Sequence, residues 1–510
     1  MKFNLNPKET LSNDEIKEGL SLLKLDGIFS QSMSILLSGT FTVPLLLLLG
    51  ANRFHIGLLS FIISLSSFTQ LLSPIIANKF YSRKKVSVLF SLLTRLFLLA
   101  LSISLILGFI TNIFILLIFF SFFYLLANIS SGTFSFWMLD LVPNDIRGSY
   151  FASRTKTSML IGSLIGLSVA LYIGYFITDE KIIYYSFIIL LAAILGLIGV
   201  FFLANVPEPK FKNLETFSIN GMKNLLKVKN IRIHHTAMFL LYLAMGISTP
   251  FFIYYLIAIL GFDTITVFIV TMTSQFVTIF LLPKWGFLVD KYGVKPVLRL
   301  SSFIMISTLL LWPFTTLPGR HPLSLLIVFI IYILMGLALG GLNLSSGLIA
   351  YKLVENNGAH YEMPLNNITI SLGTAIGAVI GSILSIPYKR VELSTTITIS
   401  LENKVQIFLI NIKDLDFVFI TSAVIGFLAI SLLRKYKIDN EPEEEKNYLK
   451  MIIGLKRSVK CTMDHLLVTV SDRVIRRNSN YLSKRDRDKI ECINKIPNRI
   501  VGRIPQKEKL

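Results

Sequence analysis

The sequence predicts an all-α polytopic membrane protein with twelve transmembrane helices, arranged as two six-helix halves. Its 510 residues are 53% hydrophobic and only 16% charged, and the mean hydropathy is +0.67, which is too apolar for a soluble enzyme of this length. Twelve stretches of about 20 mostly apolar residues follow one another, and each is long enough to cross a bilayer. A repeated polar motif divides these stretches into two sets of six.

The repeat consists of two short basic turns. The second, at residues 285–298, has the sequence WGFLVDKYGVKPVL, and the first lies 212 positions earlier, with Pro74 in place of Gly286. The other replacements are Asn78 for Asp290, Lys79 for Lys291, Phe80 for Tyr292 and Arg83 for Lys295. One gap later, GSLIG at 162–166 corresponds to GTAIG at 373–377. Unrelated apolar segments would not keep a common offset, so the chain contains a duplicated membrane unit.

Residues 1–26 are expected to form a cytoplasmic segment ahead of the first span. Ser12 and Glu15 have the spacing of a capping box, and apolar residues recur behind them, which predicts a short amphipathic surface helix leading into that span. The first 25 residues hold as many acids as bases, unlike a cleavable signal. The predicted spans of the N-terminal half, residues 27–205, are 27–49, 56–77, 86–109, 112–137, 156–178 and 182–204.

Residues 206–233 are predicted to be a cytoplasmic linker, because VPEP at 206–209 and the Lys-bearing stretch behind it are too polar for lipid. The spans of the C-terminal half, residues 234–434, are 235–260, 264–284, 297–316, 323–349, 365–386 and 415–433. Alternating Thr and Ile residues in segment 387–414 predict a small extracytoplasmic β-hairpin. In the basic tail, residues 435–510, apolar and basic residues alternate over 447–477, which favours either an amphipathic helix on the anionic inner leaflet or a disordered tether.

Lys and Arg residues favour one side of the predicted spans. That side holds Lys79, Arg83, Lys84, Lys85, Lys210, Lys212, Lys223, Lys227, Lys229 and Arg232, whereas short turns on the other side have Arg53, Lys181 and Arg320. The positive-inside rule then places both termini in the cytoplasm. This orientation accounts for the net charge of +20, so nucleic-acid binding is not expected. Cys461 and Cys492 both lie in the tail and provide no extracellular disulfide framework.

The segment from Gly286 to Leu298 resembles the loop signature of the major facilitator superfamily: a Gly, an Asp four positions on, a basic residue, a Gly and another basic residue. In that family the loop lies between the second and third helices of a six-helix half, and here it lies between the eighth and ninth predicted spans. The resemblance covers about residues 30–433. It implies a secondary transporter that exposes a central cavity alternately to each side of the membrane, and it is nearly silent on the substrate.

Eight residues are candidates for gating at the cytoplasmic face. They are Gly286, Asp290, Lys291, Gly293, Lys295, Asp140, Arg147 and Arg154. Gly286 would let a backbone approach a neighbouring helix, Asp290 would cap a helix start or pair with a cation, and Gly293 would permit the chain reversal. The loop WMLDLVPNDIRG at 137–148 resembles the corresponding loop of bacterial members of the family, and its charges are expected to cluster with Asp290. For the two lysines, the alternative is that they only set orientation.

The resemblance implies that the first, fourth, seventh and tenth helices line the cavity. Their polar residues at mid-depth are the candidates for substrate binding: Gln31, Ser34, Ser38, Thr40, Tyr124, Asn128, Tyr242, Ser248, Thr249 and Asn343, with Gln70 and Gln275 as further contributors. A single Ser or Thr is more often bonded to its own helix, whereas an amide in lipid needs partners. A lining without fixed charge favours a neutral or amphipathic solute, such as a sugar or a drug.

No Asp or Glu lies in the middle of a predicted span, although proton-coupled carriers usually need an ionisable residue inside the membrane. Asp26, at the edge of the first span, is therefore the candidate for coupling to a proton. The alternative is that Asp26 is an interfacial residue at a helix start. Arg95, about nine residues into span 3, is either functional or extends its side chain back to the near interface.

Two stripes of glycines place small residues on one face of a span. They are Gly162 and Gly166 in span 5, and Gly373, Gly377 and Gly381 in span 11. Such faces let helices approach closely in lipid. Because the resemblance places both spans at the interface between the halves, we interpret them as sliding surfaces, with static packing as the alternative.

Nothing in the sequence predicts an enzyme, a cofactor or a metal site. His234 and His235 point to different helix faces without a Cys or carboxylate at ligand spacing, and there is no phosphate-binding loop for ATP. We therefore expect a monomeric secondary transporter of the cytoplasmic membrane that moves a small solute through the lipid bilayer. The alternative is a non-transporting scaffold or lipid-handling protein on the same fold, and solute flux into vesicles distinguishes the two.

Overall fold

The computed structural model describes residues 7–9, 11–110, 112–143, 146–176, 181–211, 219–316, 321–353, 359–401 and 404–435. Within these residues, twelve helical segments are long and apolar enough to cross a membrane, which confirms the predicted number of spans. The predicted amphipathic segment at 447–477 lies outside the described residues.

The elements of the N-terminal half are α1 (Asn13–Leu36), α2 (Gly39–Leu48), α3 (Arg53–Ser66), the 3₁₀-helix η1 (Ser67–Leu72), α4 (Ser73–Phe80), α5 (Arg83–Ile106), α6 (Ile113–Leu141), α7 (Arg147–Phe176) and α8 (Ile182–Asn205). Those that follow are α9 (Ile219–Leu225), α10 (Lys229–Ser248), α11 (Phe251–Tyr254), the π-helical turn η2 (Tyr255–Ile259), α12 (Thr264–Tyr292), α13 (Val294–Leu309), η3 (Pro313–Thr316), α14 (Ser324–Leu353), α15 (Ala359–Tyr388), β1 (Glu392–Leu401), β2 (Lys404–Lys413) and α16 (Leu415–Leu433).

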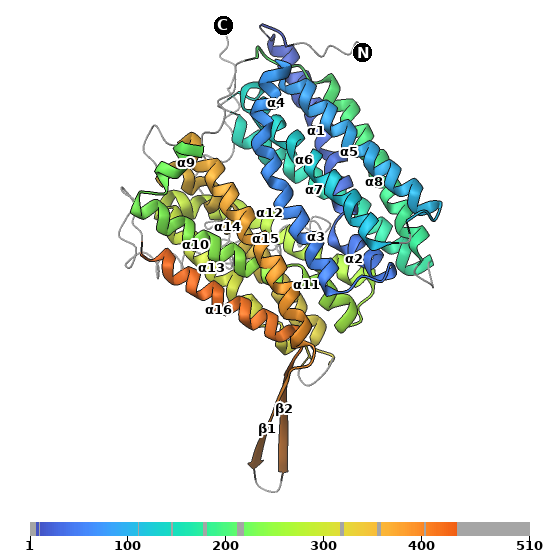
Figure 1. The fold of residues 1–510 in the computed structure, drawn as a ribbon, viewed down its shortest axis with the longest axis vertical. Helices are drawn as coiled ribbons and strands as arrows, with labels where there is room; N and C mark the ends of the chain where they lie inside the picture. Colours follow the sequence, from blue (N-terminus) through green and yellow to red (C-terminus); the bar gives the residue numbers. More distant parts are fainter. Residues whose placement is uncertain are drawn as a thin grey trace, which may run out of the picture.

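The two sets of helices form two bundles that lie side by side (Figure 1). The hairpin β1–β2 projects from one end of the molecule, which we call the hairpin face, and α4, α9 and the start of α1 lie at the opposite end. The opposite end also carries the described linker residues 206–211, and we call it the linker face. Each bundle has its own apolar core, because the buried residues of the two halves fall largely into separate clusters.

The first helix begins where the sequence predicts but does not form a separate surface helix. Ser12 and Glu15 make both hydrogen bonds of a capping box, and α1 then continues without a break to Leu36. The predicted N-terminal helix is therefore continuous with the first span. One face of this N-terminal stretch is buried, and Gly19 packs against Pro207, so the helix has a partner that the sequence pattern does not reveal.

The halves contact each other mainly through α3 with α15 and α7 with α12. Gly57 of α3 lies so close to Ser382 of α15 that a β-carbon would collide with its hydroxyl, and Gly174 of α7 abuts Ile265 of α12 in the same way. Ser163 of α7 also contacts the sulfur of Met272 at 3.3 Å. Gly57, Ser382, Gly174 and Ile265 lie near the ends of their helices that point toward the hairpin face. The halves are therefore joined in the part of the molecule nearer that face.

The two glycine stripes differ from the prediction that both are sliding surfaces. Gly373, Gly377 and Gly381 face the backbone of α10 within their own half, so they provide static packing between α15 and α10. Gly162 packs on α1, also within its half, whereas Gly166 reaches Phe268 of the other half. Spacing alone gives the small-residue face but not the helix that it meets.

The hairpin forms over the predicted segment. Its strands pair antiparallel from Glu392 opposite Lys413 to Leu401 opposite Lys404. The chain leaves β2 through Asp414, which has a positive φ of 58°, and α16 begins at once. The hairpin is therefore joined directly to the ends of α15 and α16.

Candidate functional site

A cavity of about 440 Å³ lies between the two halves. Its walls come from α1 and α2, α3, α6, the junction of α10 and α11, and α15. We call it the inter-half cavity and define it by its lining residues: Ser34, Leu37, Ser38, Gly39, Thr42, Val43, Ile56, Leu59, Ser60, Ile63, Ser64, Tyr124, Gly246, Thr249, Pro250, Ile253, Thr374 and Ala378.

The first helix of each half is interrupted at this cavity. In the N-terminal half the break separates α1 from α2 at Leu37 and Ser38, and in the C-terminal half it separates α10 from α11 at Thr249 and Pro250. These two breaks lie 212 positions apart, the same offset as the repeat in the sequence. Breaks of this kind bring backbone and short side chains to a site, and at this depth they occur where the chain lines a cavity.

The lining of the inter-half cavity is mostly apolar, with hydroxyl groups among the apolar side chains and no charged group. Eight hydroxyl-bearing residues contribute to it, and none of the lining residues is Asp, Glu, Lys, Arg or His. The hydroxyl-bearing residues are Ser34, Ser38, Thr42, Ser60, Ser64, Tyr124, Thr249 and Thr374. Ser38 stands out because its buried hydroxyl has no hydrogen-bond partner among the described residues. A buried hydroxyl of this kind suits a ligand that supplies the missing hydrogen bond.

Four of the residues predicted to bind substrate line this cavity: Ser34, Ser38, Tyr124 and Thr249. Asn128 lies one turn from Tyr124, and its amide donates to the Tyr124 carbonyl at 2.8 Å and to the Ser66 hydroxyl at 3.0 Å, so it joins α6 to α3. Thr40 is buried and faces Thr271 of the other half at 3.4 Å.

The other candidates lie elsewhere. The Tyr242 hydroxyl contacts the Ser346 hydroxyl at 3.2 Å inside the C-terminal half, and the Ser248 hydroxyl donates to carbonyls of its own helix. Gln31, Asn343, Gln70 and Gln275 are not among the lining residues. Thr42, Ser60, Ser64 and Thr374 also line the cavity and were not predicted. Thr42 lies in the first span, whereas the other three lie on spans from which only glutamines or no residues were predicted. The spacing of Ser60 and Ser64, four apart on one helix face, was the available signal.

An ion pair between the halves closes the hairpin face. The guanidinium of Arg53, at the start of α3, pairs with both carboxylate oxygens of Asp414, which precedes α16. Arg53 also donates to the Ser385 carbonyl of α15 at 3.2 Å, and it stacks over the ring of Tyr254 at 5.5 Å. The two charged side chains are only 12% and 24% exposed. The sequence predicts only that Arg53 lies in a short outer turn, and it does not predict this contact.

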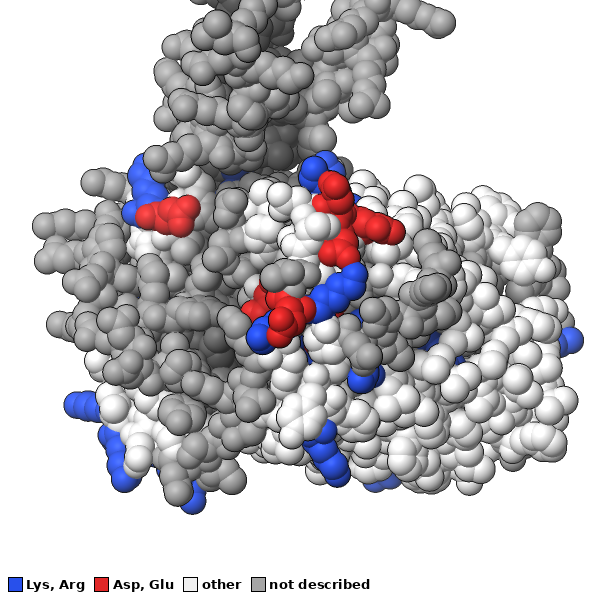
Figure 2. All heavy atoms as spheres, turned by 90° about the horizontal axis from the view of Figure 1, so that it is seen from above, with Lys and Arg blue, Asp and Glu red and all other residues white. Residues whose placement is uncertain are grey.

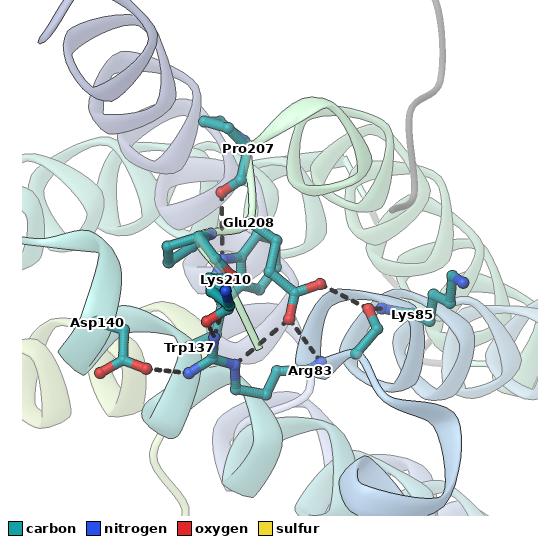
Figure 3. A network of polar contacts seen from close by, with 9 residues as sticks. Arg83, Lys85, Trp137, Asp140, Pro207, Glu208 and Lys210 are labelled. Carbon is teal, nitrogen blue, oxygen red and sulfur yellow. Dashed lines mark hydrogen bonds and ion pairs between the residues drawn. The ribbon is translucent and has the colours of Figure 1, made fainter. Parts of the chain in front are cut away.

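A network of polar contacts fastens the start of the linker to the N-terminal half (Figure 3). Glu208 is buried, and its carboxylate accepts from the Ser82 hydroxyl at 2.6 Å and from the Arg83 backbone at 2.7 Å. The Arg83 guanidinium pairs with Glu208 and with Asp140, and it donates to the carbonyls of Pro209 and Lys210. A charged linker end would otherwise be solvated, so this network fixes where the linker leaves the bundle.

The second copy of the basic turn makes the corresponding contact. Lys295, the counterpart of Arg83, is buried and points its ammonium group to the Arg434 carbonyl at 3.5 Å, at the end of α16. In both halves the basic residue after this turn therefore meets the end of the sixth helix of its own half. The positive-inside rule does not require Lys295 to have a partner or to be buried. The contact with the Arg434 carbonyl therefore accounts for its burial better than that rule does.

The other predicted gating residues do not come together. Gly293 has a φ of 96°, as the expected reversal requires, but a side chain at Gly286 would meet no described residue within 4 Å. Asp290 is exposed and lies near the end of α12, not at a helix start. Asp140 pairs with Arg83 and Arg154 pairs with Asp26, so these charges form two separate ion pairs within the described chain. The side chain of Arg147 is outside the described residues.

Asp26 lies near the middle of α1 and is buried inside the N-terminal half. Its carboxylate accepts from the Arg154 guanidinium at 3.0 Å and from the Ser30 hydroxyl at 3.1 Å. The interpretation as an interfacial helix-start residue is therefore wrong. Arg95 is also buried, donates to the Ser91 carbonyl at 3.3 Å, and packs against Gly196 of α8, so its side chain does not extend to the interface.

The linker face carries acidic and basic side chains next to each other (Figure 2). The described ion pairs of this face include Lys8 with Glu15, Lys210 with Glu9, and Arg83 with Asp140. Within the described residues there is no group of three His, Cys, Asp or Glu side chains that would hold a metal ion.

Comparisons with known proteins agree on the architecture. The family model of the Major Facilitator Superfamily matches residues 235–458. A crystal structure of a mutant of the nucleoside transporter NupG has a TM-score of 0.62 at 16% identity, covering 82% of this chain and 99% of that one. The D-xylose-proton symporter gives 0.61 at 13% identity (84% and 99% covered), and a bacterial homologue of the iron transporter ferroportin, inward-facing, gives 0.59 at 14% (83% and 99%). A search of curated proteins gave no significant match.

Proposed function

We propose that this chain, a major facilitator superfamily protein by its fold and by the sequence of its C-terminal half, transports a small neutral solute rich in hydroxyl groups by alternating access. The observation that carries the proposal is the inter-half cavity, with eight hydroxyl-bearing residues and no charged one. Hydroxyl groups donate and accept hydrogen bonds without fixed charge, which suits a sugar or another polyol better than a phosphate or a dicarboxylate. The chain would act as a monomer.

The arrangement of contacts supports an inward-facing state if the linker face is cytoplasmic. The halves are held together at the hairpin face by Arg53 with Asp414 and by Gly57 against Ser382. At the linker face, the signature turn of α12 has open space at Gly286. In the opposite state the linker-face ends would approach each other, and Gly286 and Asp290 would then contact the N-terminal half. The gating role of this turn therefore belongs to the state that closes the linker face.

Filling the cavity tests the proposal. Replacing Ser60 with Trp places a large ring in the cavity wall and should reduce solute uptake by purified protein in vesicles at least tenfold, because the solute loses its volume. Ser431→Trp is the matched control, since Ser431 is exposed on α16 and does not line the cavity. A panel of neutral sugars, polyols and nucleosides supplies the substrates. Uptake by the Ser60→Trp protein equal to that of the control would contradict the assignment of the cavity.

The orientation is tested by labelling from outside the cell. Single cysteines at Ser394, an exposed residue of β1, and at Asn224, an exposed residue of α9, are introduced in a background lacking Cys461 and Cys492. We expect an impermeant thiol reagent to modify the first in intact cells and the second only after lysis, because the Lys and Arg distribution places the linker inside. Modification of both cysteines in intact cells would refute this orientation.

A further inference from the structure

A histidine and a glutamate meet inside the C-terminal half, away from the inter-half cavity. His235 lies in the second turn of α10, and Glu362 lies in the first turn of α15. The Nε2 atom of His235 is 3.0 Å from the Oε1 atom of Glu362, and the two side chains are 5% and 0% exposed. No other element of the transport proposal uses either group, so a buried ionisable pair remains to be explained.

The hydrogen bonds around His235 define where its protons are. The Thr369 hydroxyl donates to the Leu365 carbonyl at 2.8 Å, so its oxygen must accept from the Nδ1 atom of His235, which lies 3.0 Å away. Nδ1 therefore carries a hydrogen, and Nε2 faces the carboxyl group. If neither Nε2 nor Oε1 held a proton, an unbalanced negative charge would remain in a dry site, with the two atoms 3.0 Å apart. The pair must hold one proton between these two atoms while it is buried.

Glu362 has little other support for a negative charge. Neither of its carboxylate oxygens has an aligned hydrogen bond within the described chain, because even the 3.0 Å approach to Nε2 is poorly directed. Asn366, one turn along α15, is also buried, but its side chain is engaged by His234 and by the Ser346 carbonyl and not by Glu362. A carboxyl group in such surroundings depends on the shared proton for neutrality.

The N-terminal half has an ion pair on the equivalent pair of helices. Asp26 of α1 and Arg154 of α7 join its first and fifth spans, as His235 and Glu362 join those of the C-terminal half. The guanidinium of Arg154 stays charged at any physiological pH, whereas imidazole gains and loses a proton near neutrality. The two halves are therefore alike in layout, but only in the C-terminal pair is the basic partner a group that gains and loses a proton near neutrality.

We propose that His235 and Glu362 form a proton-binding site, which is occupied while α10 and α15 are packed together and empties when water reaches the carboxyl group. The proton is bound from water and returned to water, so no other reactant is needed. The coupling role of the site rests on the proposed transport function, because only an alternating cycle would hydrate and bury the pair in turn. The pair binds a proton whether or not the chain transports a solute.

The surroundings contain few competing charges. His234 on α10 is fully buried, with its ring centred 5.3 Å from that of His235. The neighbouring bases of α9 and α10, namely Lys223, Lys229 and Arg232, are exposed. α14 contributes the Ser346 carbonyl, which accepts from Asn366 at 2.9 Å. Among the described charged groups, His235 and Glu362 are therefore each other's nearest partners.

The test is the pH dependence of thermal stability of the purified full-length protein. In the unfolded chain, histidine loses its proton near pH 6.5 and glutamate near about 4.3. The folded pair keeps one proton, so above about pH 6.5 the folded state binds one more proton than the unfolded state, and the wild type should lose stability as pH rises. Each bound proton changes the unfolding equilibrium constant about tenfold per pH unit.

Two variants give opposite expectations for this profile. In Glu362→Gln the buried His235 is neutral beside an amide, so the loss above about pH 6.5 should disappear and stability should fall below that pH instead. In His235→Asn the buried Glu362 must hold the proton alone, so the loss should begin near about pH 4.3. His321→Asn removes a half-buried histidine outside this pair and should leave the pH at which the wild-type loss begins unchanged.

Groups that titrate alike in the wild type and in a variant contribute equally to both profiles, so the difference between the two profiles reports on the His235–Glu362 pair. A wild-type profile that runs parallel to that of Glu362→Gln from pH 5 to 9 would overturn the proton site. If Glu362→Gln does not fold, an unchanged onset in His235→Asn would overturn it equally. A protein with the expected profiles that carries no solute into vesicles would keep the proton site and refute the transport proposal, so the two failures are distinguishable.

Discussion

Breaking the Arg53–Asp414 ion pair should open the hairpin face. The pair joins the two halves, both carboxylate oxygens are engaged, and the side chains are mostly shielded from water. Removing one partner of a hydrogen-bonded, desolvated charge pair costs about 2 kcal/mol or more, which corresponds to a shift of roughly 30-fold in a conformational equilibrium. Arg53→Gln should therefore move the population toward states in which this face is open.

Accessibility of the inter-half cavity measures that shift. A single cysteine at Ser60, in a background lacking Cys461 and Cys492, should react with an impermeant thiol reagent from the hairpin side at least tenfold faster in Arg53→Gln than in the parent. Asp414→Asn is the matched variant, because it removes the charge of the carboxylate and keeps the size of the side chain. The double variant should react no faster than either single one, as expected for two partners of one interaction. Additive effects would show that the two residues act separately.

The number and order of the spans could be predicted from the sequence because they depend on apolar length, which is a local property. The repeat also relates structural features that the sequence alone does not reveal. Its offset relates the breaks at Leu37 and at Thr249, and it relates the contacts of Arg83 and Lys295 with the ends of α8 and α16. A duplicated chain repeats its helix packing, so a contact found in one half indicates where to search in the other.

The candidate site was predicted less well, because it depends on which helix faces meet. Ser34, Ser38, Tyr124 and Thr249 were found from their place in the spans, whereas Thr374 lies on a helix that was not searched. Ser248 has the same type of side chain and, like Ser34 and Thr249, donates to a carbonyl of its own helix, but it does not line the cavity. No periodicity distinguishes these cases, since both residues are hydroxyl-bearing and lie at mid-depth.

The charged residues inside the bundles show a second limit of sequence reasoning. Asp26 and Glu362 lie near the ends of apolar stretches, and hydropathy places such residues at the interface. In the structure both are buried, because partners from distant helices, Arg154 and His235, neutralise them. A partner more than one hundred residues away leaves no local pattern.

The burial of Asp26 leads to the second large effect. Asp26→Asn removes the carboxylate but leaves the guanidinium of Arg154 beside it and the buried Arg95 nearby. Breaking a buried pair in this way typically costs about 3–5 kcal/mol, because an uncompensated charge remains inside the protein. We expect the Asp26→Asn protein to have a markedly lower thermal midpoint and lower yield of folded protein, which contrasts with the small cost expected for an interfacial residue.

Glu9→Gln is the control for this prediction, because Glu9 also pairs with a basic residue, Lys210, but both side chains are mostly exposed. Its thermal midpoint should not change measurably, since exposed ion pairs contribute little. Asp26 does not line the inter-half cavity, and its carboxylate is engaged by Arg154 and Ser30, so we expect a structural role rather than proton transfer. An Asp26→Asn protein with wild-type stability that fails to accumulate solute under a pH gradient would contradict this expectation and make Asp26 the proton carrier.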